Sequence, residues 1–191
     1  MSTAAPIRDA RTPVRQDPAE RRRGMYHLAS PVSVLTVTAE ERMHGTTAST
    51  VTLVSRRPLL VGVVLRTGSS FGRLAAREGR YAITVLGADQ ADVARWFADS
   101  GRPDGSEQFD GLRWQPDSYA NAPLLAGGLA HYSCRFHSKV AVGDGELLLG
   151  YVVRARTADG PPLLSYAGDL YGGHLKPTRG EPVPRDGRAG A

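Results

Sequence analysis

The feature that most constrains the fold is a succession of short segments rich in Val, Ile, Leu and Thr, each followed by turn residues. Segments of this length and composition are typical of β-strands. We predict strands at residues 32–38, 46–55, 59–65, 81–86, 129–142 and 146–156, with 163–166 as a further strand that would close the sheet. The first three follow one another directly, which favours an antiparallel meander.

Turn residues separate these strands. Residues 40–43 form the first turn. Gly143-Asp144-Gly145 joins the two longest strands and predicts a tight hairpin, because Asp-Gly readily supplies the positive φ angles of such a turn.

Only two or three short helices are expected. A helix over 19–29 would stop at Pro31, since proline lacks the amide donor and restrains the residue before it. Another starts after the hydroxyl cap of Ser69 and ends at Gly79, a suitable C-cap, and a third covers 91–98. These helices are too few to cover a doubly wound sheet. A mainly β fold follows, in which the sheet closes into a barrel and so removes its exposed edges.

The charge of the chain is concentrated at its two ends. The 191 residues carry a net charge of +5, of which residues 1–24 hold +3 and residues 174–191 hold +2. Both ends are rich in Pro, Arg, Gly and Asp and are expected to be disordered tails around one domain at 25–173. Because the domain itself has no basic excess, nucleic-acid binding is not expected.

Redox chemistry by a dithiol is excluded, since Cys134 is the sole cysteine and is expected to be a buried, inert thiol. No Cys/His cluster has zinc spacing, and the histidines at 131, 137 and 174 are expected to be structural or surface residues. We expect neither a metal site nor a membrane span, and a cytoplasmic location.

Several reaction classes are made unlikely by missing motifs. The chain has no G-x-G-x-x-G after a strand, no P-loop, no G-x-S-x-G and no H-E-x-x-H. The polar, Gly- and Pro-rich loop at 99–121 is long, and loops of that length are commonly functional or face a partner.

Two segments could form a binding site. At 44–49, a Gly and small polar residues begin a strand, so that backbone amides and hydroxyls could approach a flat ligand. At 66–70, an arginine and two serines precede a helix, where free amides could hold a phosphate. Each segment also has a simpler interpretation, the first as an exposed threonine-rich strand and the second as an ordinary helix cap.

Taken together, the segments resemble the flavin reductase-like domain family, in order and in spacing. The matching stretches are HGTTASTVTLVSRRP (44–58), LLVGVVL (59–65), GSS (68–70), EGRYAITVL (78–86), ARWF (94–97), FDGLRW (109–114), APLL (122–125), GDGELLLGYV (143–152) and LSYAGDLYG (164–172). They cover residues 25–172, nearly the whole expected domain.

The resemblance implies an antiparallel, Greek-key-like FMN-binding split barrel, usually a homodimer with the flavin near the subunit interface. It implies an NAD(P)H:flavin oxidoreductase that binds FMN, or else FAD, takes hydride from NADH or NADPH, and supplies reduced flavin to a partner monooxygenase, as in secondary metabolism. Carried over by position, the residues that would line the flavin ring are Gly45, Thr46, Thr47, Ala48 and Ser49, and those at its phosphate are Ser69 and Ser70, to which we add Arg66. Hydride passes directly between two stacked rings, so no catalytic side chain is expected.

The chain departs from the family at the hairpin, where many members carry a histidine associated with the nicotinamide and this chain has Gly145. We place Asp144, Gly145, Tyr171 and His27 on the nicotinamide side. The loss of an imidazole leaves two other functions open. One is a split-barrel flavoprotein that acts directly on a small organic substrate without nicotinamide, and the other is a flavin-carrying protein without turnover.

Overall fold

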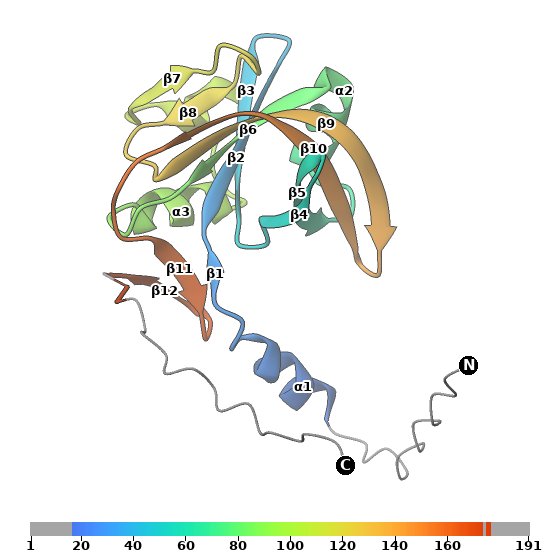
Figure 1. The fold of residues 1–191 in the computed structure, drawn as a ribbon, viewed down its shortest axis with the longest axis vertical. Coiled ribbons are helices and arrows are strands. Elements are labelled where there is room, and N and C mark those ends of the chain that lie inside the picture. Colours follow the sequence, from blue (N-terminus) through green and yellow to red (C-terminus); the bar gives the residue numbers. More distant parts are fainter. Residues whose placement is uncertain (1–16, 174, 177–191) are drawn as a thin grey trace, which may run out of the picture.

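A computed structural model describes residues 17–173 together with 175 and 176, and its centre is one seven-stranded antiparallel sheet (Figure 1). The strands of this sheet are β2 (Ser33–Ala39), β3 (Arg42–Ala48), β4 (Thr52–Arg56), β5 (Leu59–Arg66), β6 (Arg80–Val85), β9 (Ala130–Val142) and β10 (Gly145–Thr157). Their spatial order is β3-β2-β6-β9-β10-β5-β4. The predicted mainly β, antiparallel fold is confirmed.

The expected meander of the first three strands is not present. β2 and β3 pair at one end of the sheet, whereas β4 and β5 pair at the other. The single strand predicted at 46–55 is divided, because β3 ends at Ala48 and the chain crosses to the far end of the sheet over residues 49–51. Thr50 ties this crossing to β5, since its Oγ1 donates to the Val64 carbonyl oxygen at 2.8 Å and accepts from the Val64 amide at 3.1 Å.

The remaining strands form two small sheets. One contains β1 (Ser30–Pro31), β11 (Leu163–Tyr166) and β12 (Asp169–Gly172) in the order β1-β11-β12, and the other pairs β7 (Trp114–Pro116) with β8 (Pro123–Leu125). The segment at 163–166 was expected to close the main sheet. It pairs with β1 instead, and the positive φ angles of Ala167 and Gly168 turn the chain straight back into β12.

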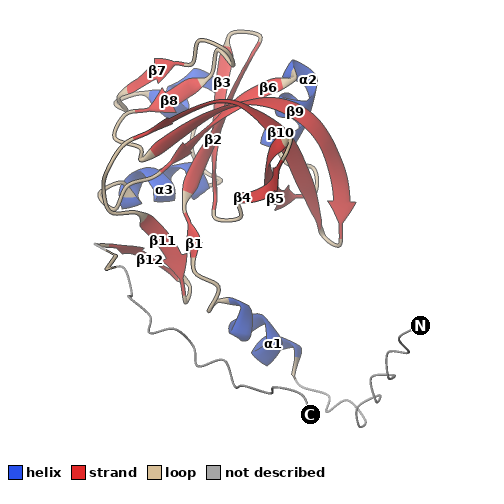
Figure 2. Cartoon of the chain, in the orientation of Figure 1, coloured by secondary structure: helices blue, strands red, loops and turns tan. Residues whose placement is uncertain are grey.

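Three α-helices and one 3-10 helix accompany the strands in the described residues (Figure 2). They are α1 (Pro18–Met25), α2 (Ser70–Glu78), α3 (Ala91–Ala98) and the 3-10 helix Gly105–Phe109. Both predicted caps of α2 are confirmed. Ser69 Oγ accepts from the Gly72 amide at 3.3 Å, and Gly79 takes a left-handed φ of 70°. None of these helices is long and apolar enough to cross a membrane.

Helix α1 occupies part of the segment that was expected to be a disordered tail, and it ends earlier than the helix predicted at 19–29. It begins at Pro18 because Asp17 caps it, with Asp17 Oδ1 accepting from the Ala19 amide at 3.0 Å. It buries no residue, and it lies beyond β1, away from the curved sheet (Figure 1). Of the tails predicted at 1–24 and 174–191, residues 1–16, 174 and 177–191 lie outside the described residues.

The β9–β10 hairpin forms as predicted, but a different glycine supplies its turn. Val142 pairs with Gly145, so the loop is Gly143-Asp144, and the positive φ of 60° belongs to Gly143. Glycine at the first central position of a two-residue loop is typical of a type II′ turn. Gly145 is instead the first residue of β10 and is buried.

β2 is buried along nearly its whole length because both of its faces are covered. Leu35 and Val37 face the barrel interior, whereas Val32 and Val34 belong to a second cluster beneath α3. Cys134 is buried in the barrel interior, as expected, and burial raises the pKa of its thiol to about 12. A thiol with that pKa stays protonated at neutral pH, which fits an inert core residue.

Candidate functional site

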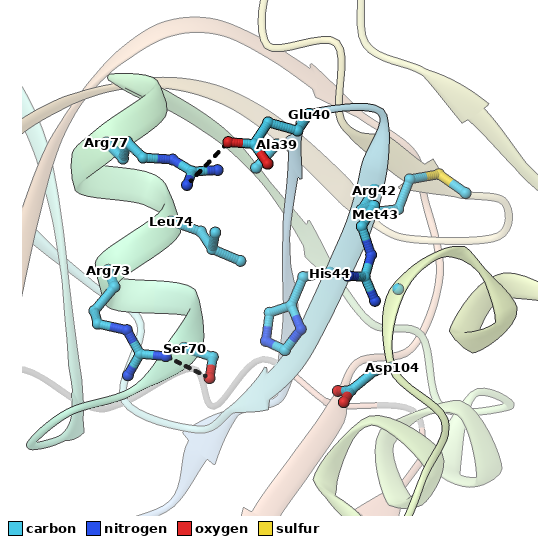
Figure 3. A pocket seen from close by; sticks show the side chains of 11 residues that line it. Ala39, Glu40, Arg42, Met43, His44, Ser70, Arg73, Leu74, Arg77 and Asp104 are labelled. Atoms are coloured by element: carbon cyan, nitrogen blue, oxygen red, sulfur yellow. Dashed lines mark hydrogen bonds and ion pairs between the residues drawn. The ribbon is translucent and has the colours of Figure 1, made fainter.

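Three cavities lie in a row along β3, where it passes between α2 and the loop that follows α3. The first, of about 490 Å³, we call the threonine cavity, and it is lined by Thr46, Thr47, Ala48, Ser49, Thr50, Val64, Leu65, Arg66, Ser69, Phe97, Ala98, Ser100 and Arg102. The second, of about 250 Å³, we call the serine cavity, and it is lined by His44, Thr46, Ser69, Ser70, Ser100, Arg102 and Asp104. The third, of about 300 Å³, we call the arginine cavity, and Figure 3 shows it.

The threonine cavity collects most of the residues predicted to bind a cofactor. Those that line it are Thr46, Thr47, Ala48, Ser49, Arg66 and Ser69, which come from β3, β5 and the start of α2. These elements are distant in the chain, and the sheet order alone does not place β3 beside β5. The crossing segment at 49–51 joins them, so one continuous wall runs from β3 to β5.

The hydroxyl groups of this wall serve two purposes. Thr47 Oγ1 donates to the Ala94 carbonyl oxygen at 2.7 Å and so fixes β3 to α3, while Thr50 is bonded to Val64. Thr46 lines both the threonine and the serine cavities. Thr47 and Thr50 therefore fix the wall at two points, and it presents small polar side chains and strand backbone to the open space.

Gly45 does not line the cavity, although it was expected to contact the ring. It is buried against α3 and the 3-10 helix, where a Cβ atom would lie 2.5 Å from Phe97 Cε1 and 3.2 Å from Phe109 Cζ. Its amide donates to Gln108 Oε1 at 3.1 Å. The position needs glycine because two buried aromatic rings pack directly against the strand.

The turn before α2 joins the threonine and serine cavities. The Ser69 amide donates to the Arg66 carbonyl oxygen at 3.0 Å, and Gly68 has a φ of 76°, which only glycine adopts easily. This turn directs Ser69 and the first free amides of α2 toward the open space. Ser70 lines the serine and arginine cavities rather than the threonine cavity, and its Oγ accepts from Arg73 Nη2 at 3.2 Å.

Arg102 is the main residue that sequence reasoning missed. It lines the threonine and serine cavities, and its Nη2 donates to the Gly45 carbonyl oxygen at 2.6 Å. The ion pairs of the described residues involve Arg77, Arg95 and Lys139, so Arg66 and Arg102 take part in none of them. The only available signal was the length and polarity of the loop at 99–121, which did not single out one arginine.

The electrostatics of the serine cavity suit an anion. Burial lowers the pKa of Arg102, against the opposite influence of Asp104 and Asp99, yet an arginine remains charged at neutral pH because its ordinary pKa is so high. Burial, followed by the charges of Arg102 and Arg73, lowers the pKa of His44. His44 is therefore neutral at pH 7, and the positive charge here comes from guanidinium groups and the helix N-terminus.

The four residues expected on the nicotinamide side do not come together. Gly145 pairs with Arg66 in the sheet, and the Asp144 carbonyl oxygen accepts from Thr67 Oγ1 at 3.0 Å, so this pair adjoins the turn before α2. His27 and Tyr171 lie in another region, where both contact Tyr166. His27 Nδ1 is 3.0 Å from Tyr166 Oη, and the rings of Tyr166 and Tyr171 are 6.0 Å apart. None of the four lines the threonine cavity.

A fourth cavity, of about 670 Å³, adjoins the threonine cavity and shares Ser49 and Thr50 with it. Its other wall is formed by the segment that links α1 to β1 and by the β11–β12 turn, including Tyr26, Leu28 and Gly168. This second space lies open beside the threonine wall, so two flat molecules could meet there.

The arrangement suits binding and alignment rather than acid–base chemistry. The threonine cavity offers strand backbone, small hydroxyls and Arg66 to a planar group. The serine cavity offers a capped helix N-terminus and Arg102, beside Asp104, to an anion. Within the described residues no three His, Cys, Asp or Glu side chains gather as a metal site would require. A ring carrying a phosphate tail fits these two cavities.

Comparison with known proteins points to the same chemistry. The family model for the flavin reductase like domain matches residues 25–174. The chain is 38% identical over 145 residues to an NADPH-flavin oxidoreductase of Streptomyces viridifaciens, covering 75% of each chain. It is 36% identical over 157 residues to an NADH:riboflavin 5'-phosphate oxidoreductase of Streptomyces pristinaespiralis, covering 81% of this chain and 87% of that protein.

Solved structures agree in fold. The NADH:FAD oxidoreductase of Streptomyces globisporus, in complex with NAD and FAD fragments, superimposes with a TM-score of 0.76 at 30% identity, over 86% of this chain and 98% of that one. The flavin reductase component of a bacterial two-component tryptophan halogenase gives a TM-score of 0.76 at 29% identity, over 82% of this chain and 98% of that one. The predicted split barrel is confirmed, and the chain belongs to the flavin reductase-like domain family.

Proposed function

We propose that this protein is an NAD(P)H:flavin oxidoreductase that binds FMN between β3, β5 and α2 and passes reduced flavin to a separate monooxygenase. The observation that carries the proposal is the convergence of Thr46–Ser49, Arg66 and Ser69 on one cavity that continues to a helix N-terminus. A planar ring with a phosphate tail needs these two environments next to each other.

In this arrangement the threonine wall holds the flavin ring, and Ser69, Ser70, Arg66 and Arg102 hold the phosphate. Bound flavin supplies the hydride acceptor of the reaction. The protein stacks the two rings and excludes water, and backbone amides along the wall stabilise the negative charge of the reduced ring. Arg102 adds rigidity, because its bond to the Gly45 carbonyl oxygen fixes it against β3.

The nicotinamide would enter through the 670 Å³ cavity that shares Ser49 and Thr50 with the threonine cavity. This location is supported by the two residues that line both cavities, which makes the cavities adjacent. Its walls lie next to His27 and Tyr166, so His27 is closer to the expected nicotinamide path than Asp144 is. Gly145 of β10 pairs with Arg66, which precedes the turn before α2. It therefore lies nearer the phosphate end of the proposed flavin site.

The protein would act in the cytoplasm as a homodimer, with a partner monooxygenase of the kind found in secondary metabolism. The dimer is supported by exposed apolar side chains on the outer face of β4, β5 and β9, including Val54, Val64 and Val140. Val64 also lines the threonine cavity, which places the flavin close to this surface. Contiguous exposed apolar surface commonly marks a protein interface.

The direct test is to mix the purified protein with FMN and NADH or NADPH and to follow the nicotinamide absorbance. Oxidation far above a control without protein is the expected result. A protein that binds FMN tightly but oxidises neither nicotinamide would favour a flavoprotein that acts on another substrate or only carries flavin. A protein that binds no flavin would overturn the proposal.

A further inference from the structure

Gln108 is a fully buried polar side chain beside the site, and the proposed function does not yet use it. It belongs to the 3-10 helix Gly105–Phe109, in the long loop that follows α3, and it is 0% exposed. Burying an amide is costly unless its donor and acceptor groups are paired. The partners of Gln108 therefore show which parts of the site it holds together.

The amide oxygen of Gln108 binds two groups that can only donate. The Gly45 amide donates to Oε1 at 3.1 Å, and Arg102 Nε donates to the same atom at 3.3 Å. Neither a backbone N–H nor a guanidinium can accept, so the oxygen of the amide must face them. The backbone of Gln108 is fixed as well, because its carbonyl oxygen accepts from Trp96 Nε1 of α3 at 2.8 Å.

Arg102 is thereby held at all three of its nitrogens. Besides the bond from Nε to Gln108, Nη1 donates to the Asp99 carbonyl oxygen and Nη2 to the Gly45 carbonyl oxygen. A guanidinium has five N–H groups, so these bonds leave one on each terminal nitrogen. Two N–H groups on adjacent nitrogens of a fixed plane suit the oxygens of a phosphate. Of the three bonds, the one to Gln108 is the one made to a side chain.

The amide nitrogen of Gln108 sets the protonation of His44. Because the oxygen faces Gly45 and Arg102, Nε2 is the atom that lies 3.5 Å from His44 Nδ1. An amide nitrogen can only donate, so Nδ1 accepts and the proton of neutral His44 is on Nε2. His44 lines the serine and arginine cavities, and in Figure 3 it extends from β3 into the space beside α2. It therefore carries an uncharged N–H donor on its outer ring nitrogen.

We propose that Gln108 is the positioning residue for the phosphate of the bound flavin, because one buried amide fixes both the guanidinium plane of Arg102 and the tautomer of His44. The proposal rests on the proposed flavin site and adds the residue that organises its anion end. Gln108 lines none of the three cavities, so it acts through Arg102 and His44 and not by contact with the ligand. Its loss should weaken the binding of the phosphate and spare that of the ring, which the threonine wall holds.

The test compares FMN with riboflavin, which has the same ring and no phosphate, by calorimetric titration without nicotinamide. Gln108→Met keeps the length of the side chain and removes its polar atoms. It should raise the FMN dissociation constant about tenfold, the typical effect of losing one charge-assisted hydrogen bond, and change that of riboflavin by less than about twofold. In an Arg102→Ala background most of this FMN-specific loss should disappear, since Arg102 transmits it.

A measurement on the wild-type protein tests the same arrangement without a core substitution. Nitrogen NMR of the imidazole should show neutral His44 with its proton on Nε2. In Gln108→Glu the carboxylate can still accept from Gly45 and Arg102, but it cannot donate to His44, so His44 should carry a proton at Nδ1. A wild-type His44 that is protonated at Nδ1 would overturn the proposal.

Gln90→Met is the matched control. Gln90 is also a buried glutamine bound to backbone groups, since Oε1 accepts from the Gly87 amide at 3.0 Å and Nε2 donates to the Ala126 carbonyl oxygen at 2.9 Å. It lines none of the three cavities. Gln90→Met should lower thermal stability, as Gln108→Met does, and leave both affinities unchanged.

The outcomes separate the proposal from the proposed function. Equal weakening of FMN and riboflavin by Gln108→Met, weakening of neither, or an equal loss of FMN affinity in Gln90→Met would overturn the positioning role while FMN binding left the proposed function intact. A wild-type protein that binds neither FMN nor riboflavin would overturn the proposed function as well.

Discussion

Gly45 lies in the most characteristic segment of the chain, yet its contribution is to packing. The small residues of 44–49 suggested a backbone open to a ligand, and this holds for Thr46 through Ser49. Gly45 shares the α3 side of β3 with Thr47, because alternate residues of a strand face the same side, but it does not line the cavity. Its missing side chain leaves room for Phe97 and Phe109, which are 0% and 2% exposed.

We predict that Gly45→Ala destabilises the protein by about 1–3 kcal/mol, the usual cost of overpacking a core. The added Cβ would overlap the ring of Phe97, which is fully buried and packs against Phe109. FMN affinity should fall too, because the Gly45 carbonyl oxygen anchors Arg102. Urea denaturation and FMN titration would measure the two effects.

Gly24→Ala is the control, since nothing lies within 4 Å of the Cβ position of this α1 glycine. It should leave stability unchanged or slightly raised, as alanine favours a helix. A Gly45→Ala protein as stable as the Gly24→Ala protein would show that the aromatic rings do not fill the space beside β3.

At the scale of elements, helix α2 is defined by local chemistry and serves the site through its first turn. Ser69 caps it, Gly79 ends it, and its buried face consists of Phe71, Gly72 and Ala75. Phe71 is fully buried and meets Tyr81 edge to face with ring centroids 5.6 Å apart. This contact anchors the helix to the barrel and leaves its free amides at the cavity.

Ser69→Asp separates the capping role of this residue from its role at the phosphate. Asp is about as good an N-cap as Ser, so stability should change by less than about 0.5 kcal/mol. FMN should bind about tenfold more weakly or worse, because a carboxylate would face the phosphate dianion. Thermal unfolding and flavin titration measure the two quantities.

Ser69→Asn keeps a neutral cap and should retain most of the FMN affinity. Unchanged FMN affinity in the Ser69→Asp variant would mean that the phosphate does not sit at the start of α2.

At the scale of the molecule, the barrel leaves one apolar outer surface uncovered. Around Gly62 the outer face collects Val54, Leu147 and Leu149, and Val64 and Val140 both pair with Leu147 across the sheet. Val140 is 50% exposed and Val64 is 45% exposed. An exposed apolar surface on a β-sheet commonly marks a protein–protein interface.

We predict that the protein is a dimer in solution and that Val140→Asp shifts it toward a monomer. Light scattering during size-exclusion chromatography should give twice the 20.4 kDa of the chain for the wild type and a lower value for the variant. Val140→Thr, which nearly preserves the shape, should remain dimeric. A wild-type protein that is monomeric at micromolar concentration would contradict the prediction.

Sequence reasoning located most of the longer strands, α2 and α3 to within one or two residues, because their signals are local, and it did not find the short strands β1, β7, β8 and β12. It failed where the outcome depended on pairing between distant segments. β3 and β4 looked like one strand at 46–55, since that segment as a whole is rich in Thr, Val and Ser, and only the crossing at 49–51 separates them. The hairpin was predicted at the correct position, but its positive φ angle belongs to Gly143 and not to Gly145. From the sequence, either glycine could have supplied the turn.

The sequence by itself determined the β-rich class, the caps of α2 and the wall from Thr46 to Ser49, since alternation, capping and turn formation depend on neighbouring residues. Tertiary structure alone decided that Arg102 joins that wall, that Gly45 faces two aromatic rings, and that Arg42 and Arg73 line one cavity. The sequence does not distinguish an arginine in a surface loop from one in a binding site. The role of each arginine is decided only when long-range strand pairing brings distant segments together.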